Sequence, residues 1–203
     1  MNCENPGTPV GRLLAYLKSK MQIELTAAFN LNINPMLTAQ ELLKLLPLAK
    51  PGDTWQTANW IDSGYGRASK TLYDKEGLPY ECTVDFFKFG RIMLDPCAFF
   101  EGKSGNCYFE VAGNSVILPF TRQNFDLLQL SAPEAQALAT NILAANAADA
   151  QEKTAMLRLK GQAKYDEFIR IFGPGIEQYF PQKHIASYLG FTREYLNGLR
   201  AGR

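Results

Sequence analysis

The chain has 203 residues, of which 46% are hydrophobic and 20% charged, and it contains one histidine, His184. This composition is typical of a well-packed globular protein, and the length suits one large domain or a sensor with a small second module. Metal-dependent enzymes of the cupin type need several histidines, and a Ser or Cys triad would have to use His184 alone. A GxxxxGK[ST] phosphate loop is also absent. We therefore expect that the protein is not an enzyme, and we expect neither a metal site nor a cofactor.

The net charge of +1 conceals an uneven distribution. Residues 1–152 carry 12 basic and 16 acidic side chains, whereas residues 153–203 carry 9 basic and 4 acidic ones. The last quarter of the chain therefore suits a polyanion such as DNA, although a solvated basic helix face would give the same balance.

The sequence also bears on location. No stretch is apolar enough for a membrane span, and the N-terminus lacks the basic and apolar regions of an export signal. We expect a cytoplasmic protein without membrane contact. In that compartment reduced thiols are favoured over disulfides, and the cysteines lack CxxC spacing: Cys3, Cys82, Cys97 and Cys107.

The first part of the chain has helical periodicity broken by turn residues. Apolar side chains between residues 13 and 21 share one face, and Thr38 precedes a leucine cluster at 42–46. This pattern predicts two or three short helices, which end before Pro51.

From Trp55 to Phe125 the sequence changes character. Short segments rich in aromatic and β-branched residues are separated by Gly, Asp, Asn and Pro at intervals of roughly ten residues. This spacing predicts an antiparallel β-sandwich or jelly roll.

A long helix is predicted from Ser131 to Lys160, with Ser131 as its N-cap and Pro133 in its first turn. Steps of four and three residues define a seam that favours a dimer along this helix over a solitary connecting helix. The seam consists of Leu138, Ile142, Ala145, Asp149, Glu152, Met156 and Leu159. Its two acidic residues weaken a pure coiled-coil interpretation.

The most informative segment is FPQKHIASYLGFTREYLNGLR, from Phe180 to Arg200. It predicts a helix near Pro181, a tight turn at Gly190, and a second helix capped by Thr192. This order is typical of a helix-turn-helix, whose second helix enters the major groove of DNA.

Outward positions of this motif are candidate DNA contacts. On the second helix, Arg193 suits guanine, Glu194 suits cytosine and Asn197 suits adenine. Arg200 faces outward on the same helix, and three residues near the helix ends suit phosphates: Gln182, Lys183 and Thr192. The alternative is that these are ordinary polar residues on an exposed helix.

At this point the sequence resembles a known family. PQKHIASYLGFTREYLNGLR is similar to the C-terminal signature of the cyclic-AMP receptor protein and fumarate-nitrate regulator (Crp/Fnr) family, in the short form of the Bacteroidetes. WIDSGYGRASKTLYDKEGLPYECTVDFF resembles the family's sensor hairpins. The resemblance covers about residues 36–200. Thr192, Arg193 and Glu194 match the start of the recognition helix.

The resemblance implies an α+β protein that binds double-stranded DNA as a homodimer. Residues 1–130 would hold N-terminal helices and a cyclic-nucleotide-binding-like jelly roll, residues 131–160 the dimerisation helix, and residues 161–203 the helix-turn-helix domain. The function implied is that of a sequence-specific transcription regulator.

The sequence departs from this family at several points. The Gly-Glu-Leu and Arg-Ser stretches that hold a cyclic nucleotide are replaced by Gly90–Met93 and by Gly105-Asn106-Cys107, so cyclic AMP is not expected as effector. Asn197 and Gly198 do not match the family, so its base preference does not transfer. No room remains after Arg200 for a winged hairpin, which predicts weaker DNA binding per subunit.

Two interpretations remain open on the sequence. A module of the same architecture that has lost DNA binding would act as a small-molecule sensor or an interaction protein. If an unidentified effector exists, we expect it near polar residues of the altered stretch: Arg91, Lys103, Ser104 and Asn106.

Overall fold

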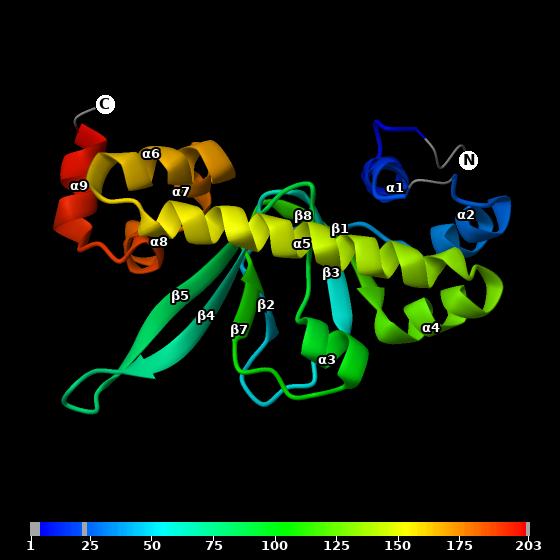
Figure 1. Ribbon diagram of the computed structural model, residues 1–203, viewed down its shortest axis with the longest axis horizontal. Coiled ribbons are helices and arrows are strands. Elements are labelled where there is room, and N and C mark those ends of the chain that lie inside the picture. Colours follow the sequence, from blue (N-terminus) through cyan, green and yellow to red (C-terminus); the bar gives the residue numbers. More distant parts are fainter. Residues whose placement is uncertain (1–4, 22–23, 202–203) are drawn as a thin grey trace.

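The structure is a computed structural model that describes residues 5–21 and 24–201, so Cys3 lies outside the described residues. The helices are α1 (Pro9–Ser19), α2 (Ala27–Ile33), the 3-10 helix η1 (Asn34–Met36), α3 (Pro96–Glu101), α4 (Arg122–Ser131), α5 (Glu134–Arg158), α6 (Gly161–Phe172), α7 (Ile176–Tyr179), α8 (Gln182–Leu189) and α9 (Arg193–Ala201). The strands are β1 (Gln40–Leu42), β2 (Leu46–Ala49), β3 (Thr57–Ser63), β4 (Tyr65–Tyr73), β5 (Pro79–Lys88), β6 (Arg91–Met93), β7 (Tyr108–Val111) and β8 (Ser115–Thr121). In Figure 1, α5 runs along the molecule, with α1, α2 and α4 near one end and α6–α9 at the other.

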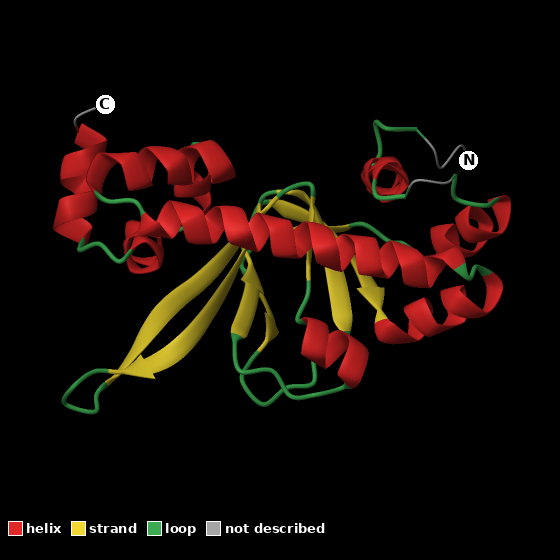
Figure 2. Ribbon diagram, in the orientation of Figure 1, coloured by secondary structure: helices red, strands yellow, loops and turns green. Residues whose placement is uncertain are grey.

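The strands form two four-stranded antiparallel sheets. The first sheet has the order β1-β8-β3-β6 and the second has the order β2-β7-β4-β5. Because the chain passes back and forth between the two sheets, the architecture is a jelly roll. The strands gather beside the middle of α5, and the β4–β5 hairpin extends away from the body (Figure 2). The α+β fold with an antiparallel jelly roll, predicted from the sequence, is confirmed.

Apolar side chains fill the space between the two sheets. Ile61, Met93 and Val111 are fully buried there. The rings of Trp55 and Phe109 lie beside them, with 4.6 Å between their centroids. A ring-sized ligand would have to displace these side chains to enter the roll.

Each sheet also buries its outer face, but against a different part of the chain. Trp60 and Leu118 of the first sheet pack into a cluster with α1, α2, α4 and α5. Tyr65 and Phe86 of the second sheet pack into a cluster with α6, α7 and α8. The jelly roll therefore lies between an N-terminal helical layer and a C-terminal helical module.

The leucine cluster at 42–46 is not helical, so this prediction is wrong. Leu42 ends β1 and Leu46 begins β2, the edge strands of the two sheets. Backbone pairing with β8 and β7 replaces the helical hydrogen bonds. Pro47 is accommodated because an edge strand leaves one side without ladder hydrogen bonds.

The start of the long helix also differs from the prediction. Ser131 is the last residue of α4, a helix that the sequence reasoning missed, and α5 begins after Pro133 without a side-chain cap. Thr121 caps α4 instead, accepting a hydrogen bond from the backbone N–H of Asn124 at 3.1 Å. With 25 residues, α5 spans about 37 Å. Among the residues described, no helix is long and apolar enough to cross a bilayer.

Candidate nucleic-acid interface

Helices α8 and α9 form a helix-turn-helix. Gly190 ends α8 in the left-handed conformation, with φ of 67°, which glycine adopts without steric cost. Two residues later, the hydroxyl of Thr192 accepts a hydrogen bond from the backbone N–H of Tyr195 at 3.1 Å. The turn at Gly190 and the cap at Thr192 therefore lie where the sequence predicted them.

A small apolar core holds the two helices at a fixed angle. Ile185 and Leu189 of α8 and Leu196 of α9 are fully buried. They pack on Phe168 and Phe172 of α6, which is also buried on this side. Because the inward positions are apolar, the polar side of α9 faces away from the module.

The structure places most of the predicted DNA contacts on the surface. Thr192, Arg193, Glu194 and Asn197 are exposed, and Arg193 and Asn197 lie one helical turn apart on the same face of α9. At the start of α8, Lys183 is exposed and Gln182 is half-buried.

Arg200 differs from the other predicted contacts. Its Nε lies 3.0 Å from Oε1 of Glu177 on α7, and its side chain is half-buried. The same Oε1 accepts a hydrogen bond from the Tyr165 hydroxyl at 2.7 Å. Arg200 is therefore engaged within the module, and reaching DNA requires that it leave Glu177.

Tyr195 is an exposed aromatic residue of α9 that sequence reasoning missed. Its side chain is 48% exposed, and its ring meets Phe191 edge-on with 5.1 Å between centroids. The i, i+4 spacing of two aromatic residues across the turn is the sequence signal that marks it. Tyr195 extends the surface of α9 with an aromatic side chain.

The module is docked on the β4–β5 hairpin through aromatic residues. Phe86 of β5 is fully buried among four rings of the module, with centroid distances of 5.2–6.0 Å. These rings belong to Phe168, Phe172, Phe180 and Tyr188. In addition, the Tyr65 hydroxyl donates to the Phe172 carbonyl at 2.9 Å. The second sheet thus forms part of the module's core.

A polar network joins the hairpin to α8 beside these rings. Arg67 of β4 is buried and donates to Glu110 at 2.7 Å, to Glu81 at 2.5 Å and to Nδ1 of His184. Ser187 accepts from a backbone N–H of β5 at 3.1 Å. Burial, followed by the charge of Arg67, lowers the pKa of His184 to about 4. His184 is therefore a neutral acceptor that fixes α8 against the hairpin.

Part of the predicted dimer seam of α5 faces the chain's own domains, whereas Glu152 and Leu159 of the seam are exposed. Leu138 and Met156 are buried in the N-terminal and C-terminal clusters, and Asp149 pairs with Arg91. A row displaced by one residue along most of the seam is exposed throughout: Ala137, Asn141, Ala144, Ala148, Gln151 and Ala155. The seam is therefore only partly free for a second subunit, because Leu138, Ile142 and Met156 are used within the subunit.

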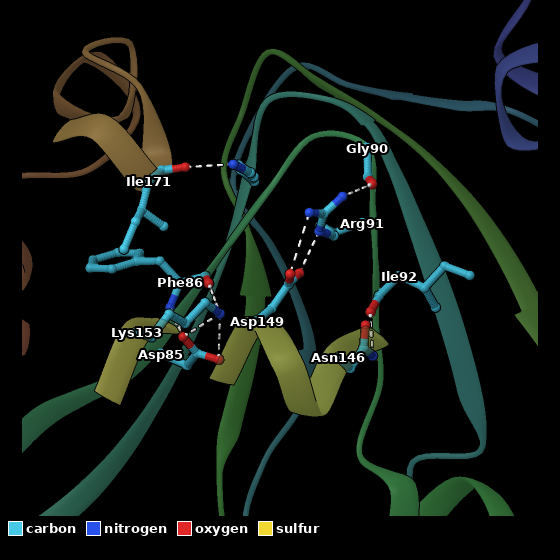
Figure 3. Close-up of polar contacts among 10 residues, drawn as sticks. Asp85, Phe86, Gly90, Arg91, Ile92, Asn146, Asp149, Lys153 and Ile171 are labelled. Atoms are coloured by element: carbon cyan, nitrogen blue, oxygen red, sulfur yellow. Dashed lines mark hydrogen bonds and ion pairs between the residues drawn. The ribbon is translucent and has the colours of Figure 1, made fainter. Parts of the chain in front are cut away.

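The four predicted effector residues do not form one site. Arg91 begins β6 and points toward Asp149 of α5 (Figure 3). Lys103, Ser104 and Asn106 are exposed in the loop between α3 and β7, where Lys103 pairs with Glu101 at 2.5 Å. Arg91 lines a cavity between α5 and the strands β5 and β6, away from the α3–β7 loop.

Three of the cysteines lie within the described part of the chain. Cys82, Cys97 and Cys107 are free thiols. Within residues 5–21 and 24–201, no group of three His, Cys, Asp or Glu side chains is arranged to hold a metal ion.

Solved structures share this architecture. FixK2 from Bradyrhizobium japonicum superposes with a TM-score of 0.62 at 15% identity, over 82% of this chain and 83% of its own. CLP of Xanthomonas campestris, described as a c-di-GMP responsive global regulator, gives 0.60 at 14% identity over 87% and 93%. A transcriptional regulator of the Crp/Fnr family from Eubacterium rectale gives 0.61 at 15% identity over 89% and 85%. The chain has the fold of the Crp/Fnr regulators.

The resemblance inferred from the sequence is thus confirmed at the level of the fold. No protein-family model matches the sequence, and no curated protein matches it significantly. Identities near 15% establish architecture, and function must be argued from the site itself.

Proposed function

We propose that the protein is a sequence-specific DNA-binding transcription regulator, not an enzyme. The observation that carries this proposal is the α9 surface, where Arg193, Glu194 and Asn197 are exposed on a helix whose opposite side is fixed in an apolar core. These side chains match the hydrogen-bonding edges of guanine, cytosine and adenine in the major groove.

The start of α8 and the cap of α9 supply the phosphate contacts in this proposal. Gln182, Lys183 and Thr192 stand at helix N-termini, where backbone N–H groups and the helix dipole favour an anion. Arg200 joins them only if its ion pair with Glu177 opens. Arg193 is therefore the principal arginine of the interface.

A homodimer along α5 completes the proposal. The exposed residues of α5 with four-and-three spacing include Ala137, Ala144, Ala148 and Ala155, whose small side chains permit close helix approach. A two-fold axis beside α5 would present two copies of α9 to two half-sites of a palindromic operator.

Cyclic AMP is not the effector that we propose. The roll interior is packed with Met93, Trp55 and Phe109, and Gly105-Asn106-Cys107 offers no arginine for a cyclic phosphate. An effector, where one acts, is expected beside α5 and Arg91 instead.

Fluorescence anisotropy on labelled duplex DNA tests the proposal. The full chain is titrated on a random duplex pool and on its own upstream region, over a range of salt concentrations. Binding that weakens steeply with salt and is reduced in Arg193→Ala supports a regulator. Lys103→Ala is the matched control, because Lys103 lies in the α3–β7 loop.

The contrary outcome is equally defined. A folded protein that fails to bind either DNA at low salt, with candidate nucleotides added, is not a DNA-binding regulator. The interpretation that remains is then a small-molecule sensor or interaction module of the same architecture.

A further inference from the structure

Two cavities, one apolar and one that also carries charged side chains, meet beside α5. The first, of about 90 Å³, lies between the outer face of the first sheet and the helices α1, α2, α4 and α5. The second, of about 360 Å³, lies between α5 and the strands β5 and β6. Both are lined by Ile92, Leu94 and Leu143, so the cavities adjoin along these three side chains.

The first cavity is almost wholly apolar. Its lining includes Phe29, Leu118, Phe125 and Leu138, all buried in the N-terminal cluster. Ala139 lies on its α5 side and leaves space where a larger side chain would fill it. An apolar cavity of this kind excludes water and accepts an alkyl or aromatic group.

The second cavity is lined by charged side chains of both signs (Figure 3). Lys153 donates to Asp85 at 2.7 Å and to the Phe86 carbonyl at 2.8 Å, and Arg91 pairs with Asp149. These two cations therefore already have carboxylate partners.

Lys88 is the third cation that lines this cavity. Its Nζ donates to the Ile171 carbonyl at 2.6 Å, and within the described residues no ion pair joins it to a carboxylate. Glu152, which also lines the cavity, is paired with Arg170 at 2.5 Å. Burial, together with the charge of Arg91, lowers the pKa of Lys88. An anion beside Lys88 would therefore be stabilised.

We infer that the two cavities form one binding site for an amphiphilic anion, a carboxylate with a short or medium alkyl chain. The alkyl chain occupies the apolar cavity, and the carboxylate lies beside Lys88. Such a site combines a mostly apolar lining with a few polar groups, as small-molecule sites do. Because α5 contributes to both cavities, occupancy would restrain the proposed dimerisation helix. The binding claim itself does not depend on DNA binding.

Titration calorimetry and thermal unfolding of the full chain test this inference, with octanoate as the probe. Octanol has the same chain without the anion, octylamine has the opposite charge, and acetate lacks the chain. We expect saturable binding of octanoate and a raised melting temperature. Octanol should bind about tenfold more weakly, and acetate should not bind. Concentrations stay below those at which octanoate forms micelles.

Variants separate the two halves of the site. Lys88→Gln should reduce octanoate affinity to that of octanol, whereas Lys103→Gln, an exposed control, should leave it unchanged. Ala139→Leu should abolish binding of both ligands. If that variant does not fold, Ala58→Leu fills the same cavity from β3.

Three results would overturn the inference. They are the absence of saturable octanoate binding, equal stabilisation by acetate, and an affinity that neither Lys88→Gln nor the cavity-filling variant changes. DNA binding measured on the same samples distinguishes these failures from a failure of the proposed function.

Discussion

The two ends of α5 are packed in different ways. At its N-terminal end, Leu138 and Ala139 lie in a cluster formed by apolar side chains of helices and the first sheet. At its C-terminal end, Met156 joins a cluster where aromatic rings are flanked by the ion pairs of Arg67 and the hydrogen bonds of His184. Apolar contacts are non-directional, whereas hydrogen bonds require one geometry. The first end therefore supplies stability, and the second also fixes the orientation of the helix-turn-helix.

The largest expected effect comes from Phe86, which lies among four aromatic rings of the C-terminal module. Phe86→Ala should lower the free energy of unfolding by about 3–5 kcal/mol and loosen the module, because four rings lose their shared neighbour. Urea denaturation measures the stability, and small-angle X-ray scattering measures the shape. Leu118→Ala is the control at the other end, with a comparable loss of stability but an unchanged shape. A Phe86→Ala protein with the native scattering profile would contradict the orienting role.

DNA affinity separates the two arginines of α9. Arg193→Ala should weaken DNA binding by about 1–3 kcal/mol, because the exposed guanidinium would lose its proposed base contact. Arg200→Ala should mainly reduce thermal stability, since Arg200 is paired with Glu177. Fluorescence anisotropy measures the DNA affinity of both variants, and thermal unfolding measures their stability. The reverse ranking in affinity would show that the Arg200–Glu177 pair opens on DNA.

The pH dependence of stability tests the His184 contact. In the folded protein the pKa of His184 is about 4, below the ordinary histidine value of 6.5, so the unfolded chain binds more protons between these two pH values. Stability is therefore complete above pH 6.5 and declines as the pH falls toward 4, with His184 contributing about 1–2 kcal/mol after allowance for solvent screening.

His184→Gln removes this titration while keeping a hydrogen-bond acceptor for Arg67. Urea titrations of both proteins from pH 7.5 to pH 4.5 should show a steeper loss for the wild type. Parallel curves would contradict the assignment of His184 as a buried neutral acceptor.

How much of this could be predicted differs between the regions. The helix-turn-helix can be predicted from sequence because its signals are local. Gly190 turns the chain, and Thr192 caps the next helix within three residues. The jelly roll can be predicted from the spacing of its strands. Residues 42–46 were nevertheless predicted as helical, because leucine occurs in both helices and strands and the pairing partners are distant in sequence.

Local sequence patterns could not predict which face of α5 is exposed or where the candidate effector residues lie. Leu138 and Ala137 are neighbours, and which of the two faces the chain's own core depends on distant helices. Arg91 was grouped with Lys103 by sequence proximity, yet Arg91 lies against Asp149 of α5 and Lys103 lies in an exposed loop. Pairings across more than fifty residues leave no local pattern.

Gly198 gives the smallest expected effect. It lies inside α9, and among the described residues a Cβ at this position would meet no atom within 4 Å outside the helix's own backbone. Gly198→Ala should therefore raise stability by about 0.5–1 kcal/mol. If α9 approaches the DNA backbone closely at Gly198, the same variant should bind DNA more weakly. Higher stability with unchanged affinity would place Gly198 away from the DNA.

Selection of bound sequences from a random duplex library tests directly whether α9 recognises specific base pairs. The wild-type protein should enrich a palindrome whose half-sites lie about one helical turn apart, roughly ten base pairs. Asn197→Ala should relax the preference at one position of each half-site and leave the spacing intact. Enrichment without symmetry, or the same motif from wild type and Asn197→Ala, would contradict recognition by paired α9 helices.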